Sequence, residues 1–188
     1  MEPIEIVETE RLMLRRFSES DLKEMHEVLS NPEVMKFSLN GPYSLEKTAD
    51  FIRGCIEGYD KRGIGLFATV LKENRKVIGY CGFYFLAVDG TNEVEIGYRL
   101  HPSYWCRGLA TEAALAVRNL GFEELSFTRV ISCIEEANLA SIRVAEKIGM
   151  KHEKNALFRD KIPVRVYAVS RPRIFESVRP ANAAKLSG

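Results

Sequence analysis

The sequence predicts an α/β protein whose helices pack on a mixed, mostly antiparallel sheet. Two helical patterns come early in the chain, three strand patterns joined by short turns follow them, and a further helix lies between later strands. Of the 188 residues, 46% are apolar and 28% are charged, as in an ordinary globular protein. We therefore expect one domain over residues 1–175 and a small, polar, aperiodic tail over residues 176–188.

The opening elements are a strand at residues 9–17 and the helix that follows it. Leu12 and Leu14 alternate with Arg11, Met13 and Arg15 in this strand, which is the period of two of a half-buried strand. Ser18 and Asp21 have the spacing of a helix-capping pair, and the apolar face behind them extends to Leu29. Pro32 is expected to end the helix, because the residue before a proline avoids the helical region.

A second helix and a strand meander come next. Ser44 is expected to begin the helix, which runs to about Tyr59. Strands are expected at residues 65–71, 77–88 and 93–100, where apolar and polar side chains alternate or β-formers are enriched. The turns between these strands are short and polar, so the three strands are predicted to pair antiparallel in sequence order.

The segment after residues 93–100 carries the first functional signal. A helical period begins at Leu109, and Arg107, Gly108 and Ala110 bring a positive charge and little bulk to its start. The N-terminus of a helix has free N–H groups and the positive end of the dipole, which favours a bound anion. Ordinary α/β connectivity remains an alternative, and the loop lacks the P-loop and dinucleotide patterns.

The last predicted elements complete the mixed sheet. A β-branched run at residues 127–134 is typical of a buried strand, and an amphipathic helix is expected at residues 138–148, with Gly149 ending it. Two further strands are expected at residues 151–158 and 163–170, on either side of a polar turn.

Charge and hydropathy exclude several classes of partner. The formal net charge is +1, and no cluster of basic residues is interleaved with aromatics, so nucleic acid is not expected as a partner. No apolar run is long enough to span a bilayer, and the first residues are acidic where a signal peptide would be basic. A cytoplasmic protein without a membrane partner is expected.

The cysteines and histidines give neither a disulfide nor a metal signal. The cysteines are scattered without a CxxC pair and are expected to be reduced packing residues, with an active thiol at Cys106 as the alternative. The histidines are too far apart in the sequence to suggest a shared metal, so no metal site is predicted. The residues concerned are Cys55, Cys81, Cys106, Cys133, His26, His101 and His152.

Four segments of the chain carry a resemblance to a known family. They are TERLMLRRF with the SESD that follows it, EIGYRLHPSYWCRGLATEA, NLASIRVAEKIGM and VRVYAVSR. Together they resemble the GNAT superfamily of N-acetyltransferases, and within it the branch of the ribosomal-protein N-terminal (alanine/serine) acetyltransferases. The resemblance implies one N-acetyltransferase domain with helices on both faces of the sheet, acetyl-CoA as cosubstrate, and an acyltransferase activity.

The same resemblance implies where acetyl-CoA binds. The strands at residues 93–100 and 127–134 would lie parallel and splay apart, and the pantetheine arm would insert between them and bond to backbone. Asn138 would bond this arm, and a plain helix N-cap is the equal alternative. The implied cofactor-binding residues are Tyr98, Arg99, Leu100, Cys106, Arg107, Gly108, Leu109, Ala110, Thr111 and Asn138.

Two positions depart from the wider family pattern. Trp105 lies where the superfamily has Gln or Arg, although this replacement is usual in the ribosomal-protein branch. Ala145 lies where many relatives have a tyrosine as general acid, which leaves Ser141 as the available donor. A serine that simply faces the sheet is the alternative interpretation of Ser141.

The implied reaction is direct attack of an amine on the acetyl thioester, without a covalent enzyme intermediate. Because an amine with a pKa of about 10 must first lose its proton, a base is required. Glu95 is the candidate base and Glu93 the second, and the alternative is that both belong to a solvated strand face, paired with Arg99 or a neighbour. A backbone N–H around residues 97–99 would hold the oxyanion.

The acceptor amine stays open at the level of sequence. Glu135 and Glu136 follow the splayed strand and are candidates to attract a cationic amine, although such a pair is often only solvated. The predicted acceptor is a protein N-terminus or, alternatively, a small amine or toxic amino compound. A non-catalytic acyl-CoA-binding module is the remaining hypothesis, and a monomer or a homodimer is expected.

Overall fold

The computed structural model describes residues 6–159 and 161–172. Its strands are β1 (Ile6–Glu8), β2 (Leu12–Arg15), β3 (Leu66–Leu71), β4 (Lys76–Val88), β5 (Thr91–Leu100), β6 (Arg129–Ile134), β7 (Lys151–Phe158) and β8 (Ile162–Ser170). Its helices are α1 (Leu22–Leu29), α2 (Pro32–Met35), α3 (Leu45–Arg62), α4 (Leu109–Glu123) and α5 (Leu139–Lys147). The predicted tail, residues 176–188, lies outside the described residues.

In this part of the chain, eight strands form one sheet in the order β1-β2-β3-β4-β5-β6-β8-β7. Every neighbouring pair is antiparallel except β5 and β6, which run parallel. The predicted mixed, mostly antiparallel sheet is therefore confirmed, as is the meander of β3, β4 and β5. Within the described residues, no helix combines the length and the apolar character needed to cross a membrane.

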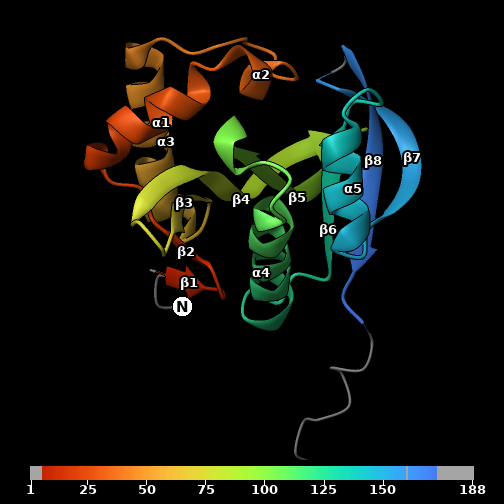
Figure 1. Ribbon diagram of the computed structural model, residues 1–188. Coiled ribbons are helices and arrows are strands. Elements are labelled where there is room, and N and C mark those ends of the chain that lie inside the picture. Colours follow the sequence, from red (N-terminus) through yellow and green to blue (C-terminus); the bar gives the residue numbers. More distant parts are fainter. Residues whose placement is uncertain (1–5, 160, 173–188) are drawn as a thin grey trace, which may run out of the picture.

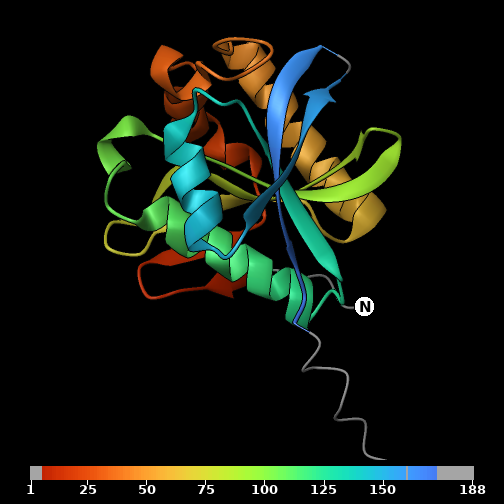
Figure 2. The same cartoon turned by 90° about the vertical axis from the view of Figure 1, so that its right-hand side faces the viewer.

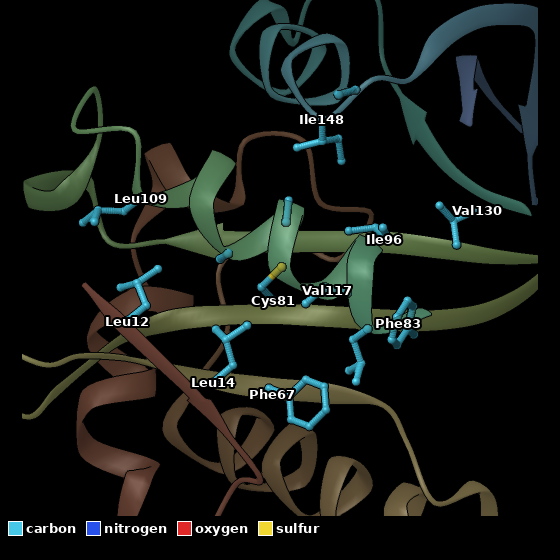
Figure 3. Close-up of a cluster of buried hydrophobic side chains, with 14 of the residues drawn as sticks. Leu12, Leu14, Phe67, Cys81, Phe83, Ile96, Leu109, Val117, Val130 and Ile148 are labelled. Atoms are coloured by element: carbon cyan, nitrogen blue, oxygen red, sulfur yellow. The ribbon is translucent and has the colours of Figure 1, made fainter. Parts of the chain in front are cut away.

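Helices cover both faces of the sheet. Figures 1 and 2 show α4 and α5 together on one side of the sheet and α1 and α3 on the other. Each side has its own hydrophobic core. The core under α4 and α5, drawn in Figure 3, includes Leu12, Leu14, Phe67, Phe83, Ile96, Leu109, Val117, Val130 and Ile148. The core under α1 and α3 includes Phe17, Met25, Leu29, Ile52, Leu66, Val70 and Tyr80.

The alternation along β5 decides which side chains serve which face. Ile96 and Leu100 are buried in the core under α4. Because successive side chains on a strand point to opposite faces, Glu95, Gly97 and Arg99 face the side of α1 and α3. One strand thus contributes apolar packing to one face and polar chemistry to the other.

The N-terminal region differs from the prediction in two places. The first strand covers Leu12–Arg15 rather than residues 9–17, and β1, a strand of only three residues, was not predicted. Pro32 does end α1, but it also begins α2, since a proline at the first helical position has the right φ and needs no N–H partner. The Asn31 side chain caps this turn by accepting the Glu33 N–H at 2.9 Å.

The parallel pair β5–β6 is short. Among the described residues, its register consists of Glu95 opposite Ile131. Immediately beyond, the Ser132 hydroxyl donates to the Ile96 carbonyl at 2.8 Å, where a backbone N–H of a longer ladder would have bonded. Figure 1 shows β6 standing across the direction of β5, so the two strands separate toward their C-terminal ends. We call the part of β5 and β6 beyond this pair, where the described register contains no further pairing of the two strands, the strand gap.

Candidate active site

The loop between β5 and α4 is anchored to the end of β5. Trp105 donates its indole N–H to the Leu100 carbonyl at 2.7 Å, which closes the loop on itself. Cys106 (φ 58°) and Gly108 (φ 78°) both adopt the left-handed conformation that turns the chain into the helix. This conformation is costly for a residue other than glycine, so the strain at Cys106 is held by the surrounding loop.

The start of α4 has the geometry of an anion site. Gly108 is the N-cap residue and has no side chain with which to accept a helix N–H. The first backbone bond of the helix runs from the Glu112 N–H to the Gly108 carbonyl at 3.0 Å, so the N–H groups of residues 109–111 precede the helical ladder. Leu109 is buried in the core, whereas Cys106, Arg107 and Gly108 are exposed. The structure therefore brings the predicted loop residues together, with Cys106, Arg107 and Gly108 at the surface.

An ion pair from the N-terminal region holds this loop in place, and it was not predicted. Arg11 donates to the Arg107 carbonyl at 2.9 Å and to the Glu112 carboxylate at 2.7 Å. Thr9 adds a hydroxyl donor to the same carboxylate at 2.6 Å. Burial would raise the pKa of Glu112, but the hydrogen bonds from Thr9 and Arg11 outweigh it and hold the pKa below its ordinary value. The TERL segment was recognised in the sequence, but nothing there indicated its partner 101 residues away.

The strand gap exposes one particular stretch of β5 backbone. The Ile96 carbonyl points toward β6, where it accepts from Ser132. Because backbone groups two residues apart on a strand point to the same edge, the Tyr98 N–H and C=O also face β6. In the described register, Tyr98 lies beyond the last pair with β6. Of residues 97–99, Tyr98 is therefore the one whose backbone N–H points toward β6, and it becomes the candidate for the predicted oxyanion donor.

Glu95 lies at the closed end of the strand gap. Its carboxylate accepts the Cys133 N–H of β6 at 2.8 Å and is only partly exposed. Burial raises the pKa of Glu95 to about 7, and the Cys133 N–H and the charge of Arg99 oppose this rise. A carboxyl with this pKa can accept or release a proton near neutral pH, which is the property required of a general base.

Glu93 is placed differently from Glu95, although both share a face of β5. Arg129 on β6 donates to the Glu93 carboxylate at 3.2 Å and also pairs with Glu153 on β7 at 2.7 Å. The alternative of a paired strand face therefore describes Glu93, with Arg129 rather than Arg99 as its partner. Glu95 has no ion pair of its own within 4.0 Å among the described residues.

The first turn of α5 faces β5 across the strand gap. The Asn138 side chain accepts the Ser141 N–H at 3.2 Å, so the N-cap interpretation of Asn138 is confirmed. The Tyr98 hydroxyl donates to the Ser141 carbonyl at 3.0 Å and ties α5 to β5. Ser141 is partly exposed, whereas Ala145, where many relatives have a tyrosine, is fully buried.

A polar cluster on the side of α1 and α3 was not predicted. Arg99 donates to the Tyr80 hydroxyl at 3.0 Å, and the Tyr84 hydroxyl donates to the same oxygen at 3.0 Å. The Tyr84 ring lies directly over Gly97, where a Cβ atom would meet a ring carbon at 2.5 Å. Glu95 is the cross-strand neighbour of Tyr84 on this face. The cluster depends on how β4 and β5 pair with each other, and this register cannot be read from a single sequence. We call these four side chains (Tyr80, Tyr84, Glu95 and Arg99) the acceptor-side cluster.

The acidic pair after β6 does not form a free anionic patch. The Glu136 carboxylate accepts from Arg165 on β8, so its charge is compensated. Glu135 is partly buried, and its carbonyl accepts the Asn138 N–H at 2.9 Å. Glu136 therefore gives little support to the hypothesis that the acidic pair attracts the amine, and the hypothesis is left to the Glu135 carboxylate. Within the described residues, no group of three or more His, Cys, Asp or Glu side chains is arranged to hold a metal ion.

Comparisons with known proteins agree on one family. Residues 11–151 match the family described as an acetyltransferase (GNAT) domain. The chain is 32% identical over 158 residues to the uncharacterized N-acetyltransferase YnaD of Bacillus subtilis (strain 168), covering 84% of this chain and 88% of the relative. It also resembles a solved GNAT-family acetyltransferase from Bacillus anthracis, with a TM-score of 0.75, 30% identity and coverage of 88% and 98%.

A second solved structure shares the fold at lower identity. It is RimL, a ribosomal L7/L12 α-N-protein acetyltransferase, in complex with coenzyme A. The TM-score is 0.74 at 24% identity, over 89% of this chain and 98% of that one. At this identity the likeness concerns the fold alone.

Proposed function

The chain belongs to the GNAT acetyltransferase family, and from this premise we propose that it transfers the acetyl group of acetyl-CoA to a primary amine. One observation carries the proposal. A carboxyl group with a pKa of about 7 lies at the closed end of the strand gap, while an anion-binding helix start lies past the open end of β5. An acyl donor held along β5 would bring its thioester near this base.

The cofactor fits the backbone of the site. The N–H groups of Cys106 to Thr111 and the positive end of the α4 dipole suit the pyrophosphate, and no capping side chain competes at Gly108. The Tyr98 carbonyl suits the pantetheine arm, because an edge of β5 without a strand partner can bond an extended chain. The Asn138 side-chain oxygen already accepts the Ser141 N–H, so Asn138 can hold this arm only through its side-chain NH2 group and the remaining lone pair of that oxygen.

The chemical step assigns one task to each group. Glu95 takes the proton of the amine, and the amine nitrogen then attacks the acetyl carbon. The Tyr98 N–H stabilises the oxyanion that forms as the carbonyl is attacked. The Ser141 hydroxyl donates a hydrogen bond to the CoA sulfur as the C–S bond breaks, and the departing thiolate takes the second proton from the nitrogen, which yields the amide and CoA. Cys133 positions Glu95 through its N–H.

The acceptor is proposed within two classes. One is the N-terminal amine of a protein, as the structural likeness to RimL suggests. The other is a small amine or toxic amino compound. We further propose that the reaction takes place in the cytoplasm, and that the protein is a monomer or a homodimer.

A panel of amines tests the proposed activity. The full chain is incubated with acetyl-CoA and peptides beginning with Ala, Ser or Met, polyamines, or amino-acid-like compounds. Thiol release and the mass gain of one acetyl group are both measured. We expect acetylation of at least one class, and its loss in the Glu95→Gln variant, with CoA binding retained in calorimetry. Tight binding of acetyl-CoA without acetylation of any amine would overturn the proposal in favour of a non-catalytic acyl-CoA-binding module.

A further inference from the structure

The acceptor-side cluster narrows the class of substrate, on the premise of the proposed function. We propose that the acceptor is a primary amine that also carries a carboxylate, and that Arg99 binds this carboxylate while Glu95 receives the amine. Arg99 would then be the residue that determines specificity among amines. The argument rests on the placement of Arg99, on the charges around it, and on its position relative to Glu95.

Arg99 is held in a defined place without a charged partner. Its guanidinium is partly buried on the side of α1 and α3 and donates to the neutral Tyr80 hydroxyl at 3.0 Å. Among the ion pairs of the described residues, none joins Arg99 to a carboxylate within 4.0 Å. A guanidinium has five N–H donors in a planar fork, and one bond to a hydroxyl leaves most of them for a ligand.

The energetics favour an anionic ligand at this place. A charge that is partly removed from water without a counter-ion costs free energy, and a carboxylate bound through both oxygens compensates that cost. Tyr80 and Tyr84 fix the guanidinium in advance, because they lock each other through the shared hydroxyl oxygen. A site that is already ordered loses less entropy on binding.

The spacing of Glu95 and Arg99 on β5 suits one ligand that carries both an amine and a carboxylate. Glu95 and Arg99 lie on the same face, four residues apart, so their Cα atoms are about 13 Å apart. The Tyr84 ring lies over Gly97 between them, so the two side chains flank this ring. The charge of Arg99 is felt at Glu95, where it lowers the pKa against the larger effect of burial. A ligand that spans the Tyr84 ring would meet a positive group at one end and a proton acceptor at the other.

The surroundings of the cluster disfavour a polycation. Tyr43, Phe51, Tyr80 and Tyr84 supply aromatic rings on this side, with Phe51 5.3 Å from Tyr80 and 6.5 Å from Tyr43 between ring centroids. These rings carry no formal negative charge, and the Lys47 ammonium already lies over the Tyr43 ring, 4.6 Å from its centroid. A second ammonium group would therefore lie against the Arg99 guanidinium without a compensating anion.

Matched acceptors test the proposal without any variant. Each amino acid of a series is compared with its amide and with its decarboxylated amine, which share the side chain. Each rate is expressed per unprotonated amine, because the three amines differ in pKa. Lysine, phenylalanine and a γ-amino acid extend the series over different separations of amine and carboxylate. We expect kcat/KM for the best carboxylate-bearing acceptor to exceed that of its amide by about 10- to 100-fold, as for a charge-assisted bidentate contact.

Variants then assign the preference to Arg99. Arg99→Gln should make the acid and its matched amide equal in kcat/KM, and Arg99→Lys should retain part of the difference. The acid-to-amide ratio is measured within each variant, so that a change in the pKa of Glu95, which affects both acceptors, cancels. The control is Arg53→Gln, which removes an exposed arginine of α3 paired with Asp50 and should change neither acceptor. Thermal unfolding and CoA binding verify that each variant is folded.

The outcomes separate this inference from the proposed function. Acetylation that is equal for acids and amides, or a carboxylate preference that survives Arg99→Gln, would overturn the role of Arg99 and leave the acetyltransferase activity intact. A peptide N-terminus or a polyamine as the best acceptor would overturn it as well. If no amine is acetylated at all, the proposed function fails and the inference fails with it.

Discussion

The two ends of the candidate site are built by different means. The cofactor side is a contiguous loop and helix start, residues 101–112, whose backbone N–H groups are the proposed contacts of the cofactor. The acceptor side is made of side chains from β4 and β5, which meet only because Tyr80 pairs with Arg99 and Tyr84 with Glu95 across the sheet. The first kind of site depends on local conformation and the second on strand register. This difference predicts that substitutions on the two sides affect different measured quantities.

The largest effect is expected at Glu95. Glu95→Gln keeps the size of the side chain and an oxygen that can accept the Cys133 N–H, but it removes the base. We expect kcat to fall by about 10²- to 10⁴-fold, while the Kd for CoA stays within about twofold. In the wild type, kcat/KM should rise with pH through about 7 as Glu95 ionises, and this limb should be missing in the variant.

Glu93→Gln is the matched control for this prediction. Glu93 lies on the same strand and face but is paired with Arg129, so its loss should weaken the ion pair and leave kcat within about threefold. Equal losses in the two variants would contradict the assignment of the base. A loss of CoA affinity in Glu95→Gln would contradict the separation of the two sides.

The second effect concerns stability, and its sign follows from the same pKa. Burial raises the pKa of Glu95 from 4.5 to about 7 in the folded protein, so between these values the folded state binds more protons than the unfolded state. The free energy of unfolding should therefore fall as pH rises through this window, by at most about 3 kcal/mol. Glu95→Gln removes this dependence, so its stability relative to the wild type should increase from about pH 5 to about pH 8. Urea unfolding of both proteins at these two pH values measures the difference in unfolding free energy. The same change with pH in the wild type and in Glu95→Gln would refute the prediction.

The helices and strands could be predicted from the sequence wherever the segment was long enough to show a repeating pattern of apolar residues. The meander, α4 and α5 were predicted because each has several residues of alternating or helical pattern. The strand β1 and the helix α2 contain only three and four residues, too few for a period to appear. Even so, Asn31 and Pro32 did carry the signal for α2, since Asn caps and Pro begins helices.

The candidate site could be predicted only in part, for the same reason. The anion loop was predicted because strand, small residues and helix follow one another in the chain. The Arg11–Glu112 pair and the acceptor-side cluster could not be, because each joins residues that only the folded sheet brings together. The positions of Glu95 and Ser141 are now known, but their roles stay proposals until the variants are measured.

The third effect tests the cofactor side alone. Gly108→Ala forces an alanine into φ 78°, although its Cβ would meet nothing closer than Arg11 Nη2 at 3.5 Å. The cost is therefore conformational rather than steric, about 1 kcal/mol of unfolding free energy. Because the strained residue begins α4, relaxation of the loop should weaken CoA binding by about 5- to 10-fold, with kcat at saturating acetyl-CoA nearly unchanged.

Gly90→Ala is the matched control for the loop. Gly90 has φ 75° and open space around it, and it lies in the turn between β4 and β5. It should therefore lose about the same stability as Gly108→Ala while CoA affinity stays at the wild-type value. If both variants weaken CoA binding equally, the effect is one of global stability, and the loop has no special role.

The smallest effect is expected at Ser141, where the two sides meet. The backbone of Ser141 is already committed, since its N–H donates to Asn138 and its carbonyl accepts from Tyr98. Ser141→Ala removes only the hydroxyl, so α5 should stay in place and kcat should fall by about 3- to 10-fold, the value of one hydrogen bond to a leaving thiolate. Ser170→Ala at the exposed end of β8 is the control and should be silent. An unchanged kcat in Ser141→Ala would mean that the thiolate leaves without help from this helix, and Tyr98, whose hydroxyl lies at the same turn, would become the group to test.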